Sequence, residues 1–166
     1  MPSKIYLSWA EFEEAIQYIA LKLRETEFHP DLIVAIARGG LIPGVRLSHI
    51  LRVPMRSIHM TFYDEHDNRL ERPILLIPLQ TPHEVKGKKV LLVDDIADTG
   101  LTLKNALEYL KSLGVKEVKI ATIAYKPSSI VIPDFYLFTT NKWVVFPWEK
   151  EPIIFEKGIV DHPREL

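Results

Sequence analysis

The sequence predicts an α/β fold: a Rossmann-like, largely parallel sheet flanked by helices, with a small hood made by the chain ends. Two largely apolar segments, residues 32–37 and 89–94, are each followed by a short turn and then by a helical pattern. Such apolar runs are typical of strands buried on both faces of a parallel sheet. Strands and helices alternate through most of the chain, which favours right-handed crossover connections and a parallel arrangement.

The first helix is predicted over residues 9–25. Ser8 and Glu11 have the spacing of a capping box, and apolar residues follow them at helical spacing. A strand is expected next at residues 32–37, and a glycine turn at 38–40. A helix with Pro43 in its first turn then runs to about residue 51.

The middle of the chain alternates between strand and loop patterns. A β-like stretch at 55–62 leads into a polar span at 63–72. The part of this span at 63–69 is either a flap that closes over a site or an ordinary solvated hairpin tip. A helix is expected at about 102–113, ended by Gly114. The later strands are expected at 74–77, 89–94, 118–126, 135–138 and 143–146, before a proline-containing tail without helical periodicity.

Length and composition favour one enzyme-sized domain. A chain of 166 residues, 47% of them hydrophobic, suits a single domain over residues 1–166. With 21 Lys and Arg against 22 Asp and Glu, no basic excess points to nucleic acid or to a membrane surface. The absence of cysteine excludes a disulfide framework and a thiolate nucleophile. No signal-peptide pattern or apolar run near the ~20 residues of a membrane span is present, so we expect a cytoplasmic protein.

The most informative segment is residues 90–102. Asp94 and Asp95 directly follow a buried strand, at the strand end where open α/β sheets bind their ligands. The turn from Asp98 to Thr102 then leads into a helix, whose first backbone N–H groups suit a phosphate. Carboxylates can accept hydrogen bonds from sugar hydroxyls, and the neighbouring turn can bind a phosphate. The segment therefore predicts a site for a phosphorylated sugar.

The segment at residues 90–102 resembles the phosphoribosyl pyrophosphate signature of the type I phosphoribosyltransferases, in which acidic residues end a buried strand and a Thr-Gly-x-Thr turn follows. The sequence departs at Leu101, where many relatives carry a second glycine. The strand at 33–37 with the turn after it is similar to the pyrophosphate loop of the same family, although a plain glycine turn with a solvated Arg38 is the alternative. The resemblance implies a cis peptide bond between Ala37 and Arg38. It also implies that phosphoribosyl pyrophosphate contacts Arg38, Gly39, Gly40, Asp94, Asp95, Ala97, Asp98, Thr99, Gly100, Leu101 and Thr102.

A third group of residues resembles the subgroup that acts on 6-oxopurines, the xanthine–guanine and hypoxanthine–guanine enzymes. By this resemblance Lys126 donates to the purine O6, Trp143 stacks on the ring and the main chain at Val144 reads the other edge. A Lys ammonium has donors only, so it favours a 6-oxo group over the 6-amino group of adenine. The alternatives are a solvated lysine and a core tryptophan.

The resemblance also implies the reaction and its cofactor. Purine N9 would replace pyrophosphate at the anomeric carbon, with Mg²⁺ as cofactor and Asp95 as the carboxylate nearest to the metal. Asp94 and Asp95 would fix the ribose hydroxyls, and Asp98 would take the purine N7 proton. A helix cap is the alternative role for Asp98. Trp148 is expected to pack, and Glu149 either meets the base's amino edge or structures the tail.

Two other functions compete with the enzyme. A regulator of the same fold would bind phosphoribosyl pyrophosphate or a nucleotide without turnover, but a basic patch or an added binding domain is not visible. A receiver-like signalling domain would carry its acidic pair on the first strand, whereas another α/β unit precedes Asp94.

The six histidines show no metal-ligand spacing. The expected partners are the purine base, phosphoribosyl pyrophosphate and further copies of the chain in a homodimer or homotetramer. The preferred 6-oxopurine stays open.

Overall fold

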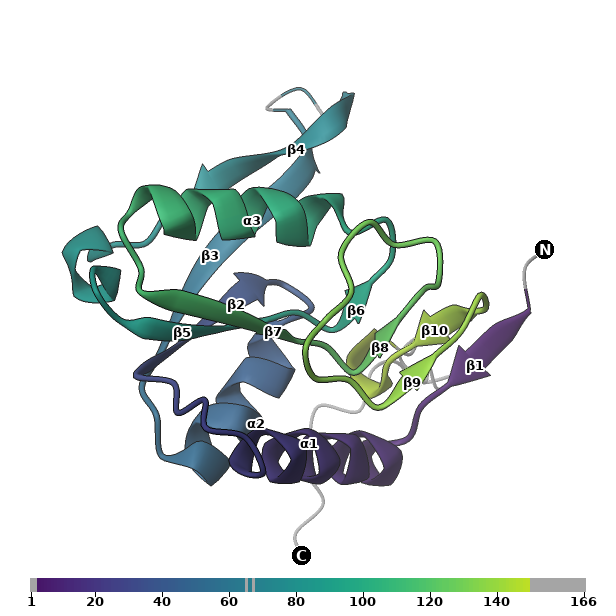
Figure 1. Cartoon of the computed structure of the whole chain (residues 1–166). Helices are drawn as coiled ribbons and strands as arrows, with labels where there is room; N and C mark the ends of the chain where they lie inside the picture. The colour runs from purple at the N-terminus through teal and green to yellow at the C-terminus, as the bar shows by residue number, and fades with distance from the viewer. Residues whose placement is uncertain (1–2, 65, 67, 150–166) are drawn as a thin grey trace, which may run out of the picture.

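The centre of the protein is a five-stranded sheet with the strand order β4-β3-β2-β5-β7 (Figure 1). The computed structural model describes residues 3–64, 66 and 68–149. Adjacent strands run parallel except for β4, which is antiparallel to β3. The predicted α/β class with a largely parallel sheet is therefore confirmed. The strands are β2 (Leu32–Ala37), β3 (Met55–Tyr63), β4 (Arg69–Ile77), β5 (Lys89–Val93) and β7 (Glu117–Ala121).

Helices cover both faces of this sheet, with α1 and α2 on one face and α3 on the other (Figure 1). In β5, Leu91 and Val93 pack with α1, whereas Val90 and Leu92 pack with α3. Because side chains alternate along a strand, the apolar run of β5 is buried on both faces. The helices are α1 (Trp9–Arg24), α2 (Leu41–Leu51) and α3 (Leu101–Ser112), with short 3-10 turns η1 (Pro82–Val85) and η2 (Pro147–Glu149).

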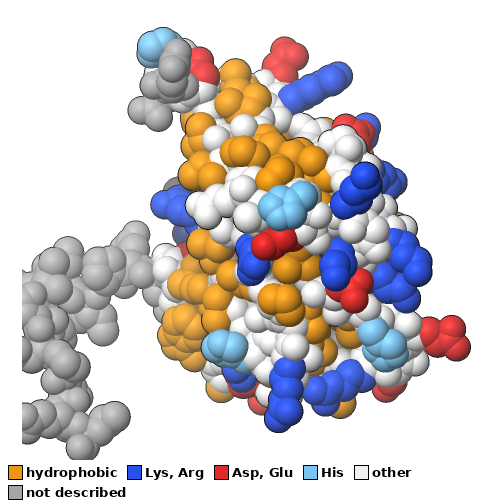
Figure 2. All heavy atoms as spheres, turned by 90° about the vertical axis from the view of Figure 1, so that its left-hand side faces the viewer, with side chains coloured by type: hydrophobic (Ala, Val, Ile, Leu, Met, Phe, Trp, Pro, Cys, Tyr) orange, Lys and Arg blue, Asp and Glu red, His pale blue; other side chains and the backbone are white. Residues whose placement is uncertain are grey.

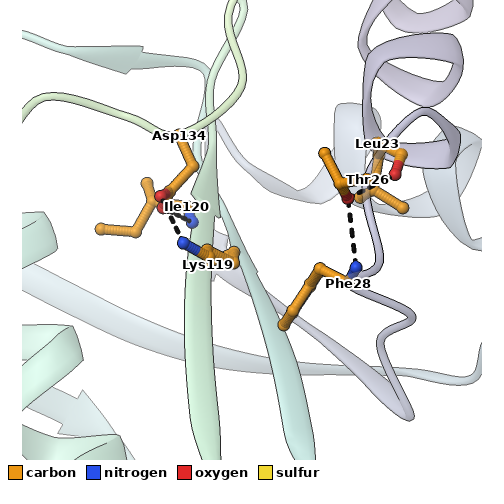
Figure 3. A network of polar contacts seen from close by, with 6 residues as sticks. All are labelled: Leu23, Thr26, Phe28, Lys119, Ile120 and Asp134. Carbon is orange, nitrogen blue, oxygen red and sulfur yellow. Dashed lines mark hydrogen bonds and ion pairs between the residues drawn. The ribbon is translucent and has the colours of Figure 1, made fainter.

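The predicted capping box starts α1. Glu11 N donates to Ser8 Oγ at 3.2 Å, and Ser8 N donates to the Glu11 carboxylate at 2.7 Å. Beyond the last turn, Thr26 Oγ1 donates to Leu23 O at 2.7 Å and accepts from Phe28 N at 3.2 Å (Figure 3). These contacts satisfy backbone groups that a helix end leaves without partners.

A hood stands beside the carboxyl end of the sheet. It contains a three-stranded sheet, and a parallel pair in which the strand near residue 5 lies against the one near residue 144. This pairing of distant segments agrees with the predicted hood. The single domain over residues 1–166 stays a prediction, and the proline-containing tail from residue 150 lies outside the described residues. The hood strands are β6 (Ile96–Ala97), β8 (Ala124–Tyr125) and β9 (Phe138–Thr139), and the pair is β1 (Lys4–Tyr6) with β10 (Trp143–Val145).

Three expected elements differ in the structure. The strand expected at 135–138 is β9, which begins only at Phe138, while Phe135 makes an isolated bridge to Ala121. The predicted strand at 118–126 is two strands in different sheets, β7 and β8. The chain leaves the central sheet at Thr122, whose N–H donates to Phe135 O at 3.0 Å and whose Oγ1 donates to Ala124 O at 2.8 Å. Asp134 holds the departing edge, since Ile120 N donates to its carboxylate at 2.8 Å (Figure 3).

The polar span predicted at 63–72 is shorter, because β4 begins at Arg69 and pairs with Tyr63 of β3. The connection between the two strands is residues 64–68. An antiparallel edge strand faces water on one side and carries polar residues there, which explains why its first half looks like a loop in the sequence.

Candidate functional site

The glycine turn and the acidic pair meet because β2 and β5 are neighbouring parallel strands, with Ala35 level with Val93. Their carboxyl ends lie at the same edge of the sheet. A Cβ at Gly39 would overlap the Asp95 carboxylate, and one at Gly40 would overlap the Val93 carbonyl oxygen. Glycine therefore lets the backbone of β5 approach at Gly40 and the Asp95 carboxylate approach at Gly39.

The peptide bond between Ala37 and Arg38 is cis, as the family resemblance implies. Arg38, Gly39 and Asp95 line a common cavity of about 620 Å³. A guanidinium and backbone amides thus lie in the cavity into which the carboxyl end of β5 opens, which is the arrangement that a highly charged leaving group requires.

The two adjacent carboxylates are held in an environment that opposes their charge. Burial raises the pKa of Asp94 well above its usual range, and the neighbouring Asp95 carboxylate adds to the rise. Burial likewise raises the pKa of Asp95 to about 6, against the hydrogen bond that Ile96 N donates to it at 2.7 Å and with repulsion from Glu149. A cation or the hydroxyls of a sugar would relieve this repulsion.

The acidic pair fits a metal that arrives with its substrate. Among residues 3–64, 66 and 68–149, His, Cys, Asp and Glu side chains form no group of three or more that could hold a metal ion. Mg²⁺ commonly takes one or two carboxylates from the protein and its other ligands from phosphates and water. Asp95, with Asp94 next to it and Glu149 across the cavity, offers such a partial set.

The turn before α3 is shaped for an anion. Gly100 is the N-cap of α3, with φ 83° and no side-chain cap, and the Thr99 hydroxyl accepts from Leu101 N at 3.3 Å. The Thr99 hydroxyl takes the N–H of Leu101, and because the N-cap glycine has no side chain, the next N–H groups of the first turn suit an anionic ligand. Only Gly100 takes the left-handed conformation there, so Leu101, inside the helix, needs no glycine.

A cavity of about 580 Å³ opens in front of this turn. Its wall includes the whole predicted phosphate turn from Ala97 to Thr102 together with Asp94. The opposite wall is the hairpin of β3 and β4, including Arg69 and Glu71. The sequence predicted either a flap or a solvated hairpin tip at 63–69, but not that Arg69 and Glu71 belong to a strand, because strand pairing is not local. A closing movement of residues 63–69 stays a prediction, and residues 65 and 67 lie outside the described part of the chain.

Three residues predicted for the base and its proton lie together. Lys126 Nζ is 2.8 Å from Asp98 Oδ1 and 5.7 Å from the centroid of the Trp143 ring. The Lys126 side chain is only 19% exposed, so it is not a freely solvated charge, and Trp143 is 51% exposed, so it is not a core residue. Val144 is only 6% exposed and packs in the core, so a contact of its main chain with a base stays a prediction. Asp98 does not cap α3.

Trp148, expected to pack, and Glu149, whose role the sequence left open, have distinct places. Trp148 stacks on Phe146 with ring centroids 5.0 Å apart and meets Phe12 edge to face, as expected for a packing residue. Glu149 accepts from Phe146 N at 3.0 Å, and its carboxylate faces the cavity of Arg38 and Asp95. No periodicity or motif in the sequence marks Glu149 as a site residue.

Comparison with known proteins agrees with this geometry. The model of the phosphoribosyl transferase domain family matches residues 2–152. A xanthine-guanine phosphoribosyltransferase of Idiomarina loihiensis is 28% identical over 148 residues, which cover 88% of this chain and 87% of the relative. The residues matched by the family model include every segment of the candidate site.

Two solved structures are similar over nearly the whole chain. The purine phosphoribosyltransferase of Pyrococcus horikoshii is 47% identical with a TM-score of 0.79, covering 93% of this chain and 99% of that one. A hypothetical protein of Neisseria gonorrhoeae with bound ppGpp is 26% identical with a TM-score of 0.81, covering 90% and 91%. The fold, the phosphate turn and the family match lead to one conclusion: the chain belongs to the phosphoribosyl transferase domain family.

Proposed function

We propose that the protein is a purine-salvage enzyme, which converts a 6-oxopurine base and phosphoribosyl pyrophosphate into a nucleoside 5'-monophosphate and pyrophosphate. The observation that carries this proposal is the cluster of Asp98, Lys126 and Trp143 directly beside the phosphate turn. A donor, a carboxylate and an exposed aromatic face are what a flat base with an oxo group requires. The purine enzymes among the relatives support the same reading.

In this proposal the sugar phosphate is held from two sides. The 5'-phosphate binds the N–H groups and hydroxyls of the turn from Asp98 to Thr102, where the N-terminus of α3 favours an anion. The pyrophosphate binds Arg38 and the amides of Gly39 and Gly40. Asp94 and Asp95 accept hydrogen bonds from the ribose hydroxyls between these two sites.

The reaction exchanges one bond for another at the anomeric carbon. Purine N9 supplies the electron pair of the new bond, and the pair of the broken bond leaves with pyrophosphate. Positive charge develops on the sugar ring meanwhile, and in this proposal the carboxylates of Asp94 and Asp95 stabilise it. The purine N7 proton passes to the Asp98 carboxylate.

Base recognition in this proposal uses one side chain for each feature of the purine. The Lys126 ammonium donates to O6, and the indole of Trp143 stacks on the ring. The main chain at Val144 meets the edge that carries the 2-position. The ion pair between Lys126 and Asp98 brings the two polar groups to one place, consistent with adjacent contacts at O6 and N7 of the same base.

Mg²⁺ is the cofactor of the proposal, and Asp95 is the carboxylate that would hold it, with Glu149 facing the same cavity. When bound, the cation neutralises the leaving pyrophosphate. The raised pKa of Asp95 supports this assignment, since a nearby cation stabilises the ionised carboxylate. Removing the metal with a chelator is expected to stop turnover, and adding Mg²⁺ back to restore it.

We further propose a cytoplasmic homodimer or homotetramer. Strand β4 leaves Ile74, Leu76 and Ile77 more than two-fifths exposed at the edge of the sheet. On the face at that edge, hydrophobic side chains gather at the surface (Figure 2). An apolar edge strand is a surface that an interface covers. Sedimentation of the protein and of Leu76→Lys tests this: the wild type is expected to assemble and the variant to lose assembly.

No described helix is long and apolar enough to cross a membrane.

The activity is tested by offering guanine, xanthine, hypoxanthine and adenine separately with phosphoribosyl pyrophosphate and Mg²⁺. Chromatography identifies the nucleotide formed from each base. Nucleotides from 6-oxopurines support the proposal and rank the substrates. Tight binding of phosphoribosyl pyrophosphate or nucleotide with no turnover of any base would favour a regulator of the same fold.

A further inference from the structure

Residues 126–131, here called the backing turn, lie behind the phosphate turn and outside the cavity in front of it. Lys126 N donates to Ala97 O at 2.9 Å, and Ile130 N donates to Thr99 O at 3.0 Å. The residue between these two acceptors, Asp98, contacts the Lys126 ammonium. The backing turn therefore holds three consecutive residues, from Ala97 at the end of β6 to Thr99 in the phosphate turn.

Ser129 closes the backing turn from inside. It is 9% exposed, its Oγ donates to Val131 O at 2.7 Å and accepts from Val131 N at 3.3 Å, and its N–H donates to Lys126 O at 2.8 Å. Buried polar groups with all these partners rigidify the segment that carries them.

Ser129 also touches the phosphate turn directly. A Cβ added at Gly100 would lie 2.6 Å from Ser129 Oγ and 2.8 Å from Val131 N. The N-cap glycine of α3 is thus packed against the Ser129 hydroxyl with no space for a side chain. A displacement of either turn has to displace the other, because packed groups at this separation cannot pass through one another.

We infer that Ser129 is a positioning residue, through which the phosphate turn and Lys126 share one geometry. The inference rests on the proposed function. Lys126 is the first residue of the backing turn, and its ammonium lies in the base site, while the Ser129 hydroxyl packs on the glycine that starts the phosphate site. Ser129 thereby places the group that recognises the base relative to the groups that bind the 5'-phosphate.

The test compares Ser129→Ala with Ser128→Ala. Ser128 is the exposed neighbour in the same turn, so its substitution removes an equivalent hydroxyl without opening the backing turn. In Ser129→Ala the KM for phosphoribosyl pyrophosphate and the KM for guanine are both expected to rise about fivefold, the effect of one lost hydrogen bond. Ser128→Ala is expected to leave both unchanged.

A double-mutant cycle with Lys126→Met separates positioning from general loosening. If Ser129 acts on the base through Lys126, then Ser129→Ala in the Lys126→Met background raises the KM for phosphoribosyl pyrophosphate but no longer that for guanine. A lower Tm of Ser129→Ala with both KM values unchanged would make the residue merely structural. A rise in only one KM in the wild-type background would disprove the link between the two sites.

Binding keeps this inference distinct from the proposed function. Ribose 5-phosphate and guanosine 5'-monophosphate are titrated into each variant by calorimetry, which needs no turnover. Weaker binding of both to Ser129→Ala than to Ser128→Ala supports the inference. Equal binding to both variants overturns the inference alone, whereas a wild-type protein that binds neither compound overturns the proposed function and the inference with it.

Discussion

Asp98 shows what a structure adds to a motif. Its position before a helix fits an N-cap as well as a proton acceptor, and sequence alone leaves both roles open. In the structure Gly100 is the N-cap, and the Asp98 side chain, half exposed, pairs with Lys126. The capping role is wrong, and the role as proton acceptor stays a prediction.

Asp98→Asn is expected to lower kcat by a factor on the order of 100 or more, because an amide cannot take the N7 proton. The KM for phosphoribosyl pyrophosphate should change little, since the backbone amides of the phosphate turn remain. Steady-state kinetics measure both constants, and a thermal melt serves as the folding control. A kcat within about fivefold of the wild type would remove Asp98 from the proton transfer.

The acidic pair makes stability depend on pH. The pKa of Asp95 rises from 3.8 in the unfolded chain to about 6 in the folded protein. Between these values the folded protein binds more protons than the unfolded chain. The stability linked to this carboxyl is therefore fully present below about pH 4 and is lost as the pH rises through about 6.

Asp95→Asn should therefore raise the free energy of unfolding of the ligand-free protein at pH 7.5, by on the order of 1–3 kcal/mol, while it abolishes activity. Near pH 4 the variant and the wild type should be alike. Urea unfolding at both pH values measures this, with the exposed Glu14→Gln as the matched control. Destabilisation by Asp95→Asn at pH 7.5 would contradict the account of a repelled, buried carboxylate.

At the scale of elements, local pattern was enough where burial was regular and failed where long-range contacts decide. The strand at 32–37 and the helices α1 and α2 follow from periodicity, caps and glycine alone. The break at Thr122 does not, because threonine favours strands and the contacts with Phe135 and Ala124 that accompany the turn out of the sheet cannot be seen in a local pattern.

The hairpin of β3 and β4 was partly misread for a related reason. The polar first half of β4, which begins at Arg69, looks like a loop in the sequence. It nevertheless pairs with β3 and forms a wall of the phosphate cavity. Neither the pairing with β3 nor the place in the cavity wall can be predicted from the local sequence, because both depend on where β4 lies in the sheet.

Arg69 of β4 lies in the wall of the cavity in front of the phosphate turn. Arg69→Ala should raise the KM for phosphoribosyl pyrophosphate several-fold, because the cavity in front of the phosphate turn loses a cation. Arg72→Ala, an exposed arginine of the same strand outside the cavity wall, is the control. Equal effects of the two substitutions in initial-rate kinetics would show that only net charge matters and that the hairpin does not face the substrate.

For the whole molecule, topology explains how distant segments make one site. The neighbouring ends of β2 and β5 bring the glycine turn to the acidic pair, and the hood adds Lys126 and Trp143. The two phosphate-binding motifs can be predicted from strand-turn-helix patterns. The meeting of Lys126 with Trp143 was expected only from the family resemblance. For Glu149 the sequence left a contact with the base or a structural role open, and its place in the cavity of Arg38 and Asp95 depends on how the hood folds back.

We propose that the assembled site transfers the phosphoribosyl group to a 6-oxopurine that Lys126 recognises. The most direct measurement is the ratio of kcat/KM for guanine to that for adenine, in the wild type and in Lys126→Met. We predict a large ratio in the wild type and a fall of at least about tenfold in the variant, since one charge-assisted hydrogen bond to O6 is lost. Efficient use of adenine by the wild type, or a ratio unchanged by Lys126→Met, would contradict the account.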